Sequence, residues 1–161
     1  MNKNKIIILL CLLVIAGCGL FKTADDLYSE AEIKRNSGEP KVALTLLEKI
    51  IKKHADHEKA PDAQYMIAEI YYRDMGDFSK AIEEYGIIQA NFPEAKQVPF
   101  SLFMQGFIYA NALSDFDQAR VHYKEFLEKY ADHELATSVT FELKYLGKDI
   151  QEIPELKHLT K

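Results

Sequence analysis

The chain has 161 residues, a length typical of a single domain, and is 48% apolar and 28% charged. This composition excludes an intrinsically disordered chain, and seven glycines with five prolines are too few for a low-complexity sequence. No sustained period-two alternation follows the first twenty residues, so a strand-rich domain is not expected.

The N-terminus has the three parts of an export signal. Lys3 and Lys5 give it a positive start, an apolar run covers residues 6–16, and small residues precede Cys18. A helix of that run would be about 16 Å long, too short to cross a hydrocarbon core of roughly 30 Å. We therefore expect residues 1–17 to be a signal peptide that takes no part in the fold.

The four residues Ile15-Ala16-Gly17-Cys18 resemble the lipobox of bacterial lipoproteins. The resemblance implies that the Cys18 thiol receives a diacylglyceryl group, that cleavage follows Gly17, and that the new N-terminus is acylated. Several acyl chains anchor a protein firmly where one chain holds it only marginally. In a bacterium with two membranes, Gly19 in place of Asp implies the outer membrane. The residues alone also allow a plain secretory signal with an incidental cysteine, or an uncleaved short anchor.

Removal of residues 1–17 would leave 18 basic and 25 acidic residues, a formal charge of −7. Such a chain lacks a basic surface for nucleic acid. It also gains nothing from anionic headgroups, so the lipid has to hold it at the membrane. We expect a short tether over residues 18–22, a repeat domain over residues 23–152 and a C-terminal tail over residues 153–161.

The remainder of the chain repeats itself with a period of about 38 residues. Four sets of positions recur at this spacing: Gly38, Gly76 and Ser114; Ala43, Ala81 and Ala119; Leu47, Tyr85 and Tyr123; Ile50, Ile88 and Phe126. Self-similarity at one period is the signature of a stacked repeat. The apolar residues of each repeat fall at helical spacing, so we predict an all-α fold of about three helical hairpins, with a capping helix over residues 137–146.

Local signals mark the ends of these predicted helices. Thr23 is a good N-cap, followed by Asp25 and Asp26 in the first turn. Gly38 supplies a left-handed or unrestrained turn position, and Pro40 suits the first turn of the next helix. A tight turn is expected at residues 75–77.

Several phrases of the sequence resemble the tetratricopeptide repeat. They are residues 68–71, 76–82 and 91–93 in the second repeat, and residues 106–109 and 115–119 in the third. In that family a small Ala or Gly lets paired helices approach, and an aromatic residue after the turn wedges between them. The resemblance covers residues 24–147 and implies a helical-hairpin solenoid.

One feature departs from the usual tetratricopeptide pattern. The period is longer than that of the family, which is about 34 residues. Part of the excess is one extra residue before the turn, because the interval from Ala68 to Ala81 is longer by one than the interval from Ala31 to Ala43. With the lipobox ahead, these long units resemble lipoproteins related to the BamD subunit of the outer-membrane β-barrel assembly machine, and Tol–Pal-associated repeat proteins. The resemblance implies a protein-binding adaptor that faces the periplasm.

His57 and His133 lie in identical tetrapeptides, Ala-Asp-His-Glu, which taken alone suggest a metal cluster. The interval between the two histidines is twice the period, so they occupy equivalent loops between repeats. We therefore predict a structural role in the loops and no metal site.

No sequence signature of catalysis is present: there is no nucleophile motif, no glycine-rich phosphate loop and no zinc-protease motif. Adjacent acids such as Glu83 and Glu84 point about 100° apart on a helix, which suits solvent better than acid–base chemistry. We expect no catalytic residue and no cofactor apart from a covalent lipid on Cys18.

Aromatic residues on the first helix of each hairpin give the remaining functional hypothesis. Eight residues lie away from the main buried stripe and would line a concave groove for a peptide or a partner helix: Tyr65, Glu69, Tyr72, Arg73, Phe100, Phe103, Phe107 and Asn111. Packing onto the next repeat would explain them equally well. The function predicted is therefore an envelope adaptor, and the alternative is an envelope enzyme or a solute- or glycan-binding lipoprotein, which a convergent polar pocket would favour.

Overall fold

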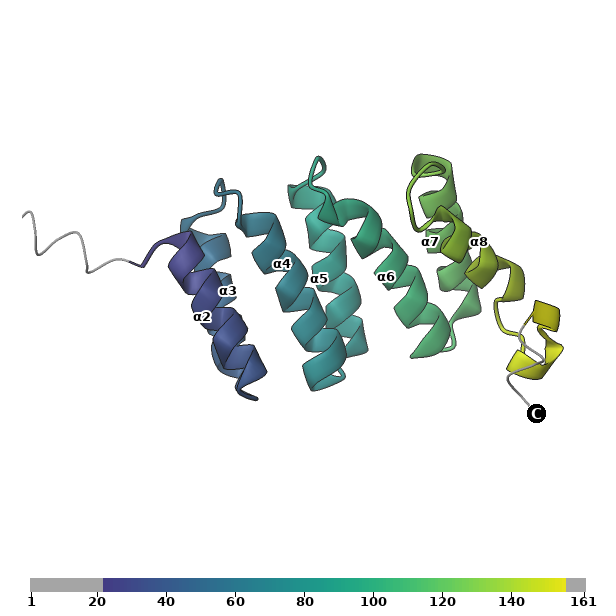
Figure 1. Cartoon of the computed structure of the whole chain (residues 1–161), viewed down its shortest axis with the longest axis horizontal. Coiled ribbons are helices and arrows are strands. Elements are labelled where there is room, and N and C mark those ends of the chain that lie inside the picture. Colours follow the sequence, from purple (N-terminus) through teal and green to yellow (C-terminus); the bar gives the residue numbers. More distant parts are fainter. Residues whose placement is uncertain (1–21, 156–161) are drawn as a thin grey trace, which may run out of the picture. The chain divides into compact units, whose positions relative to one another are not determined.

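The structure, a computed structural model, describes residues 22–155. The predicted signal peptide, Cys18 and residues 156–161 lie outside the described residues. Within the described range the chain forms helices joined by short turns, and no strand is present (Figure 1). The prediction of an all-α fold is confirmed. The chain divides into two compact units, with the boundary between Ala60 and Pro61.

The first unit contains a helical hairpin of α2 (Ala24–Asn36) and α3 (Pro40–Lys53), which pack against each other. Thr23 caps α2 as predicted: its hydroxyl accepts the Asp26 N–H at 3.1 Å, and the Asp26 carboxylate accepts the Thr23 N–H at 3.0 Å. At Gly38 the backbone has a φ of 77°, so the left-handed turn predicted there is confirmed.

The second unit begins at the second residue of α4 (Ala60–Glu69), which continues into a π-helix, η1 (Ile70–Met75). The helices that follow are α5 (Phe78–Asn91), α6 (Gln97–Asn111), α7 (Phe116–Lys129) and α8 (Ala136–Tyr145), and a 3-10 turn, η2 (Ile150–Glu152), comes last. Helix α5 packs on η1 and α6, and α7 packs on α6 and α8, so that these helices lie side by side in chain order (Figure 1). The capping helix predicted over 137–146 is thus confirmed as α8.

Residues that recur at the period of the sequence form the core of the hairpins. Nine of them have no exposed surface: Ala43, Ala81, Ala119, Leu47, Tyr85, Tyr123, Ile50, Ile88 and Phe126. The repeat in the sequence is therefore a repeat of buried contacts.

Small residues on the facing helices allow this packing, and Gly106 on α6 shows why. A Cβ atom added to Gly106 would lie 2.7 Å from two atoms of the buried Tyr123 ring on α7. Because real Cβ atoms do not approach so closely, the glycine is required for α6 and α7 to pack at this distance. Gly106 thus lets the paired helices approach, as the resemblance implies for a small residue at this position.

The extra residue of the second and third repeats is absorbed at the end of their first helices. In the first repeat the Glu39 N–H donates to the Lys34 carbonyl, five residues back, at 2.9 Å. In the later repeats the equivalent bonds reach six residues back, from Asp77 to Tyr71 at 2.9 Å and from Asp115 to Tyr109 at 2.8 Å. The insertion therefore widens the last turn and leaves the following helix in phase.

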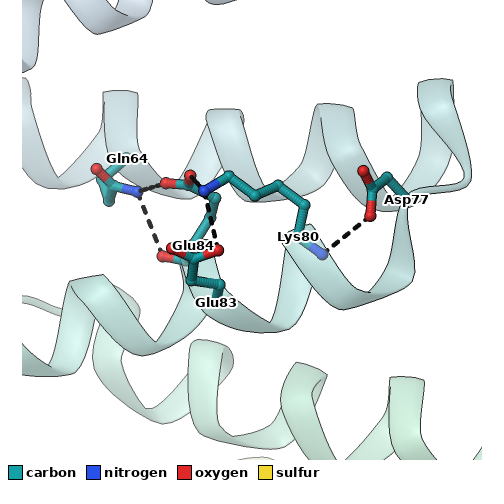
Figure 2. A network of polar contacts seen from close by, with 5 residues as sticks. All are labelled: Gln64, Asp77, Lys80, Glu83 and Glu84. Carbon is teal, nitrogen blue, oxygen red and sulfur yellow. Dashed lines mark hydrogen bonds and ion pairs between the residues drawn. The ribbon is translucent and has the colours of Figure 1, made fainter.

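Helices α4 and α5 are joined by a polar network that the periodicity did not predict (Figure 2). The buried Gln64 side chain on α4 donates to the Glu84 carbonyl at 3.3 Å and to the Glu84 carboxylate at 2.6 Å. Lys80 pairs with Glu83 at 2.9 Å and with Glu84 at 3.0 Å, and these bonds raise its pKa. The Asp77 carboxylate accepts the Lys80 N–H and so caps α5.

The end of the described chain is held against α8. Tyr145 and Ile153 are 8% and 7% exposed, and the Tyr145 hydroxyl donates to the Glu155 carboxylate at 2.6 Å. Lys144 adds an ion pair to Glu155 at 3.1 Å. The hydrogen bond from Tyr145 is the main cause that lowers the pKa of Glu155 to about 2.

The segment after α8 is expected to detach in acid. Without its partners the Glu155 carboxyl group would have a pKa of about 4.5. Because its pKa is lowered, the group stabilises the contact of this segment with α8 fully above that pH, and the effect is lost as the pH falls toward 2. A ¹³C titration of the Glu155 carboxyl group should show a midpoint near 2 in the unmodified chain. The midpoint should move toward 4.5 in Tyr145→Phe. An unmodified midpoint already near 4.5 would contradict this account.

Gly106→Ala should destabilise the second unit, because the new methyl group displaces the buried Tyr123 ring. We expect a loss of about 1–3 kcal/mol, measured by thermal unfolding followed by circular dichroism. Gly86→Ala on α5 is the matched control, since its Cβ would meet only the end of the Gln105 side chain, at 3.2 Å. Equal losses for the two variants would show that helix packing does not depend on Gly106.

Candidate functional site

A hollow of about 570 Å³ opens in the second unit beside η1 and α6. Its lining consists of Tyr72, Arg73, Phe78, Phe103, Met104 and Phe107, and we call it the aromatic groove. Four of these residues, Tyr72, Arg73, Phe103 and Phe107, belong to the set predicted from the sequence. The sequence reasoning missed Phe78 and Met104.

Helix α6 provides one wall of the aromatic groove. Phe103 and Phe107 are four residues apart, which places their side chains on one face, and their ring centroids are 5.8 Å apart. The Phe103 ring also stacks on the buried Tyr123 ring, with a centroid separation of 6.2 Å. The core of the third repeat therefore supports this wall.

The π-helix provides the other wall. Tyr72 and Arg73 lie inside the segment where the extra residue of the second repeat is absorbed. The Tyr72 ring is 6.0 Å from that of Phe78, the first residue of α5. π-Helical turns are rare and often occur at functional sites, because they reorient side chains locally. Here the widened turn is the segment that presents Tyr72 and Arg73 to the groove.

Arg73 is the one charged residue in the lining of the groove. The Arg73 guanidinium is 3.8 Å from the Glu69 carboxylate, one helical turn earlier, and its side chain is 63% exposed. Glu69 pairs with Arg73 but does not line the groove. The lining as a whole offers apolar area and one guanidinium, which suits recognition of a ligand better than proton transfer.

Three other predicted groove residues make different contacts. Tyr65 packs edge-on against Tyr85 at 5.4 Å, and burial raises its pKa. Phe100 packs edge-on against His133 at 5.2 Å. The Asn111 amide donates to the Phe107 carbonyl at 3.0 Å, and the residue lines a second hollow. None of these three residues lines the aromatic groove.

The two equivalent histidines have the structural role predicted for them. The Nδ1 atom of His57 accepts the Lys59 N–H, and that of His133 accepts the Leu135 N–H, each at 3.2 Å. Each histidine thereby closes its own loop before a helix, and the two loops have equivalent positions in the repeat. A search of residues 22–155 finds no group of His, Cys, Asp and Glu side chains arranged to hold a metal ion.

A second hollow, of about 620 Å³, lies near the end of the described chain, and we call it the C-terminal hollow. Its lining comprises Ala110, Asn111, Phe116, Phe141, Glu142, Tyr145, Leu146, Gly147, Lys148, Asp149, Ile150 and Ile153. Glu142 is half-buried there, and burial raises the pKa of its carboxyl group.

None of the helices that the structure describes is both long and apolar enough to cross a membrane. A search of curated proteins finds no significant match. Residues 21–152 match the protein family YfiO, described as outer membrane lipoprotein. The match spans the tetratricopeptide-like hairpins and includes every residue that lines the aromatic groove. The chain therefore belongs to the YfiO family of outer membrane lipoproteins.

Proposed function

We propose that this lipoprotein is a non-catalytic adaptor, which holds a protein partner at the outer membrane by binding an apolar segment in the aromatic groove. The observation that carries the proposal is the composition of one hollow. Two consecutive repeats contribute four aromatic rings, a methionine and an arginine to it. A surface of that kind typically binds a peptide or a helix of another protein.

The size and charge of the groove define its ligand. A volume of about 570 Å³ accommodates a few large side chains, and each apolar side chain that is fully buried contributes about 1.5–3 kcal/mol. The Arg73–Glu69 pair at the edge orients the segment, because the two charges distinguish its polar groups. We therefore expect a short amphipathic helix or extended segment with its apolar side directed into the groove.

The alternative function, an envelope enzyme or a solute- or glycan-binding lipoprotein, would require several polar groups directed at one point. Arg73 is the charged residue in the lining of the aromatic groove, and its ion-pair partner Glu69 does not line the groove. This lining favours the adaptor.

Tyr72→Ala and Phe107→Ala should each weaken partner capture at least about tenfold, the loss expected of a central aromatic contact. The measurement is quantitative recovery of a stoichiometric envelope partner with the membrane-anchored protein after cross-linking in cells. Val121→Ala is the matched control, because Val121 is a 56% exposed apolar residue on α7 outside the groove.

Half-buried residues such as Tyr72 and Phe107 also contribute to folding, so melting temperatures have to accompany the capture data. A variant that melts lower but captures the partner as well as the unmodified protein would exclude the groove as the binding site. Failure to recover any stoichiometric partner under several growth conditions would contradict the adaptor role itself.

A covalent lipid on Cys18 is the proposed anchor. Cys18→Ser should abolish incorporation of labelled palmitate and move the protein from the membrane fraction to the soluble fraction, because several acyl chains provide the membrane affinity. Cys11→Ser, within the predicted signal peptide, is the control and should remain membrane-bound. Continued membrane attachment of Cys18→Ser would indicate an uncleaved anchor instead.

A further inference from the structure

The C-terminal hollow is the aromatic groove repeated one period later. Each of the six groove positions has its counterpart one period further along the chain, and all six counterparts line the C-terminal hollow: Ala110, Asn111, Phe116, Phe141, Glu142 and Tyr145. The two hollows are thus equivalent surfaces of successive repeats. One equivalent surface is already expected to bind an apolar segment, and the other has the same geometric origin.

Aromatic character is kept at three of the six positions. Phe78 corresponds to Phe116, Phe103 to Phe141, and Phe107 to Tyr145. The Phe141 and Tyr145 rings are 4.9 Å apart, and Phe116 is 40% exposed. Phe116 and Phe141 therefore give the C-terminal hollow aromatic surface on which a ligand can pack, whereas Tyr145 is buried with two lysines over its ring.

Two equivalent positions differ in charge between the hollows, and both differences make the C-terminal hollow more negative. Arg73 is replaced by the neutral Asn111, and the neutral Met104 is replaced by Glu142. Arg73 is the charged residue that lines the first hollow, whereas Glu142 lines the second together with Lys148 and Asp149. The change reverses the sign of the ligand group that each hollow favours.

Within residues 22–155 the Glu142 carboxylate makes no hydrogen bond or ion pair, and burial raises its pKa. The nearby cations have other partners: Lys144 pairs with Glu155 at 3.1 Å, and Lys148, which also lines the hollow, lies 5.6 Å from the centre of the Tyr145 ring. A half-buried carboxylate without a partner is unfavourable, and an arriving cation relieves that cost.

A guanidinium group suits both the Glu142 carboxylate and the aromatic surface of this hollow. It binds a carboxylate through two parallel hydrogen bonds, and its flat face stacks on aromatic rings. The ammonium group of lysine pairs with one point only and stacks less well. The acidic balance of the whole chain, with a formal charge of −5, also attracts a basic ligand.

We propose that the C-terminal hollow binds an arginine side chain of a protein partner, with the guanidinium on Glu142 and an adjacent apolar residue against Phe116 and Ile150. Ile150 is 45% exposed at the edge of the hollow and offers that apolar contact. The site uses none of the residues of the aromatic groove, so it stands or falls separately from the function proposed above.

Two synthetic peptides provide the test: N-acetyl-Leu-Arg-Leu-amide and its citrulline counterpart, which has nearly the same shape but no charge. The protein is the full chain with Cys18→Ser, labelled with ¹⁵N and titrated by NMR. We expect the arginine peptide to shift amides of the C-terminal hollow and to bind at least tenfold more tightly than the citrulline peptide.

Glu142→Gln should remove this tenfold preference while the circular dichroism spectrum stays unchanged. Glu134→Gln, at an exposed acid in the preceding loop, is the matched control and should keep the preference. Binding of the arginine peptide should also lower the pKa of Glu142, which a ¹³C carboxyl titration detects.

Three results would overturn the proposal. They are equal affinities for the two peptides, an unchanged preference in Glu142→Gln, and no shift in the C-terminal hollow at peptide concentrations up to about 5 mM. Shifts confined to the aromatic groove would likewise exclude arginine binding at Glu142, and would leave the proposed adaptor function intact.

Discussion

The close contact between a small residue on one helix and a large buried side chain on the next is the interaction on which the second unit depends. Gly106 lies so near the Tyr123 ring that a single methyl group would collide with it. That ring in turn supports Phe103, which forms a wall of the aromatic groove. Packing in the core and the shape of the surface are therefore set by the same contact, and a change inside the hairpin alters the groove outside it.

The turn between the paired helices of the second repeat also shapes the surface of the aromatic groove. The extra residue that lengthens the repeat adds nothing to the core, since Ala81 and Tyr85 remain fully buried after it. It is absorbed in the π-helix, the segment that presents Tyr72 and Arg73. Insertions at the end of a helix cost little when the next helix keeps its phase, so surface shape can vary there while the buried contacts stay constant.

The sequence predicted the core well because a fixed period identifies equivalent buried positions directly. It predicted only four of the six groove residues, because helical spacing assigns a face and not the neighbours across a gap. Phe78 and Met104 were missed for that reason, and Asn111 lines the C-terminal hollow instead. The lining residues of the two hollows are related by the period of the sequence, and this period is the signal that links one hollow to the other. The Gln64–Glu84 hydrogen bonds had no periodic counterpart, and side-chain geometry was needed to find them.

The difference in charge between the two equivalent hollows has a consequence for any ligand long enough to reach both. Helix α6 contributes Phe107 to one hollow and Asn111 to the other, and four residues correspond to about 6 Å along a helix axis. A single strand or helix spanning both would meet Arg73 at one end and Glu142 at the other. The two ends of such a surface therefore carry opposite charges. A bound chain with one acidic and one basic end would run in a single favoured direction, because the opposite direction would place like charges together.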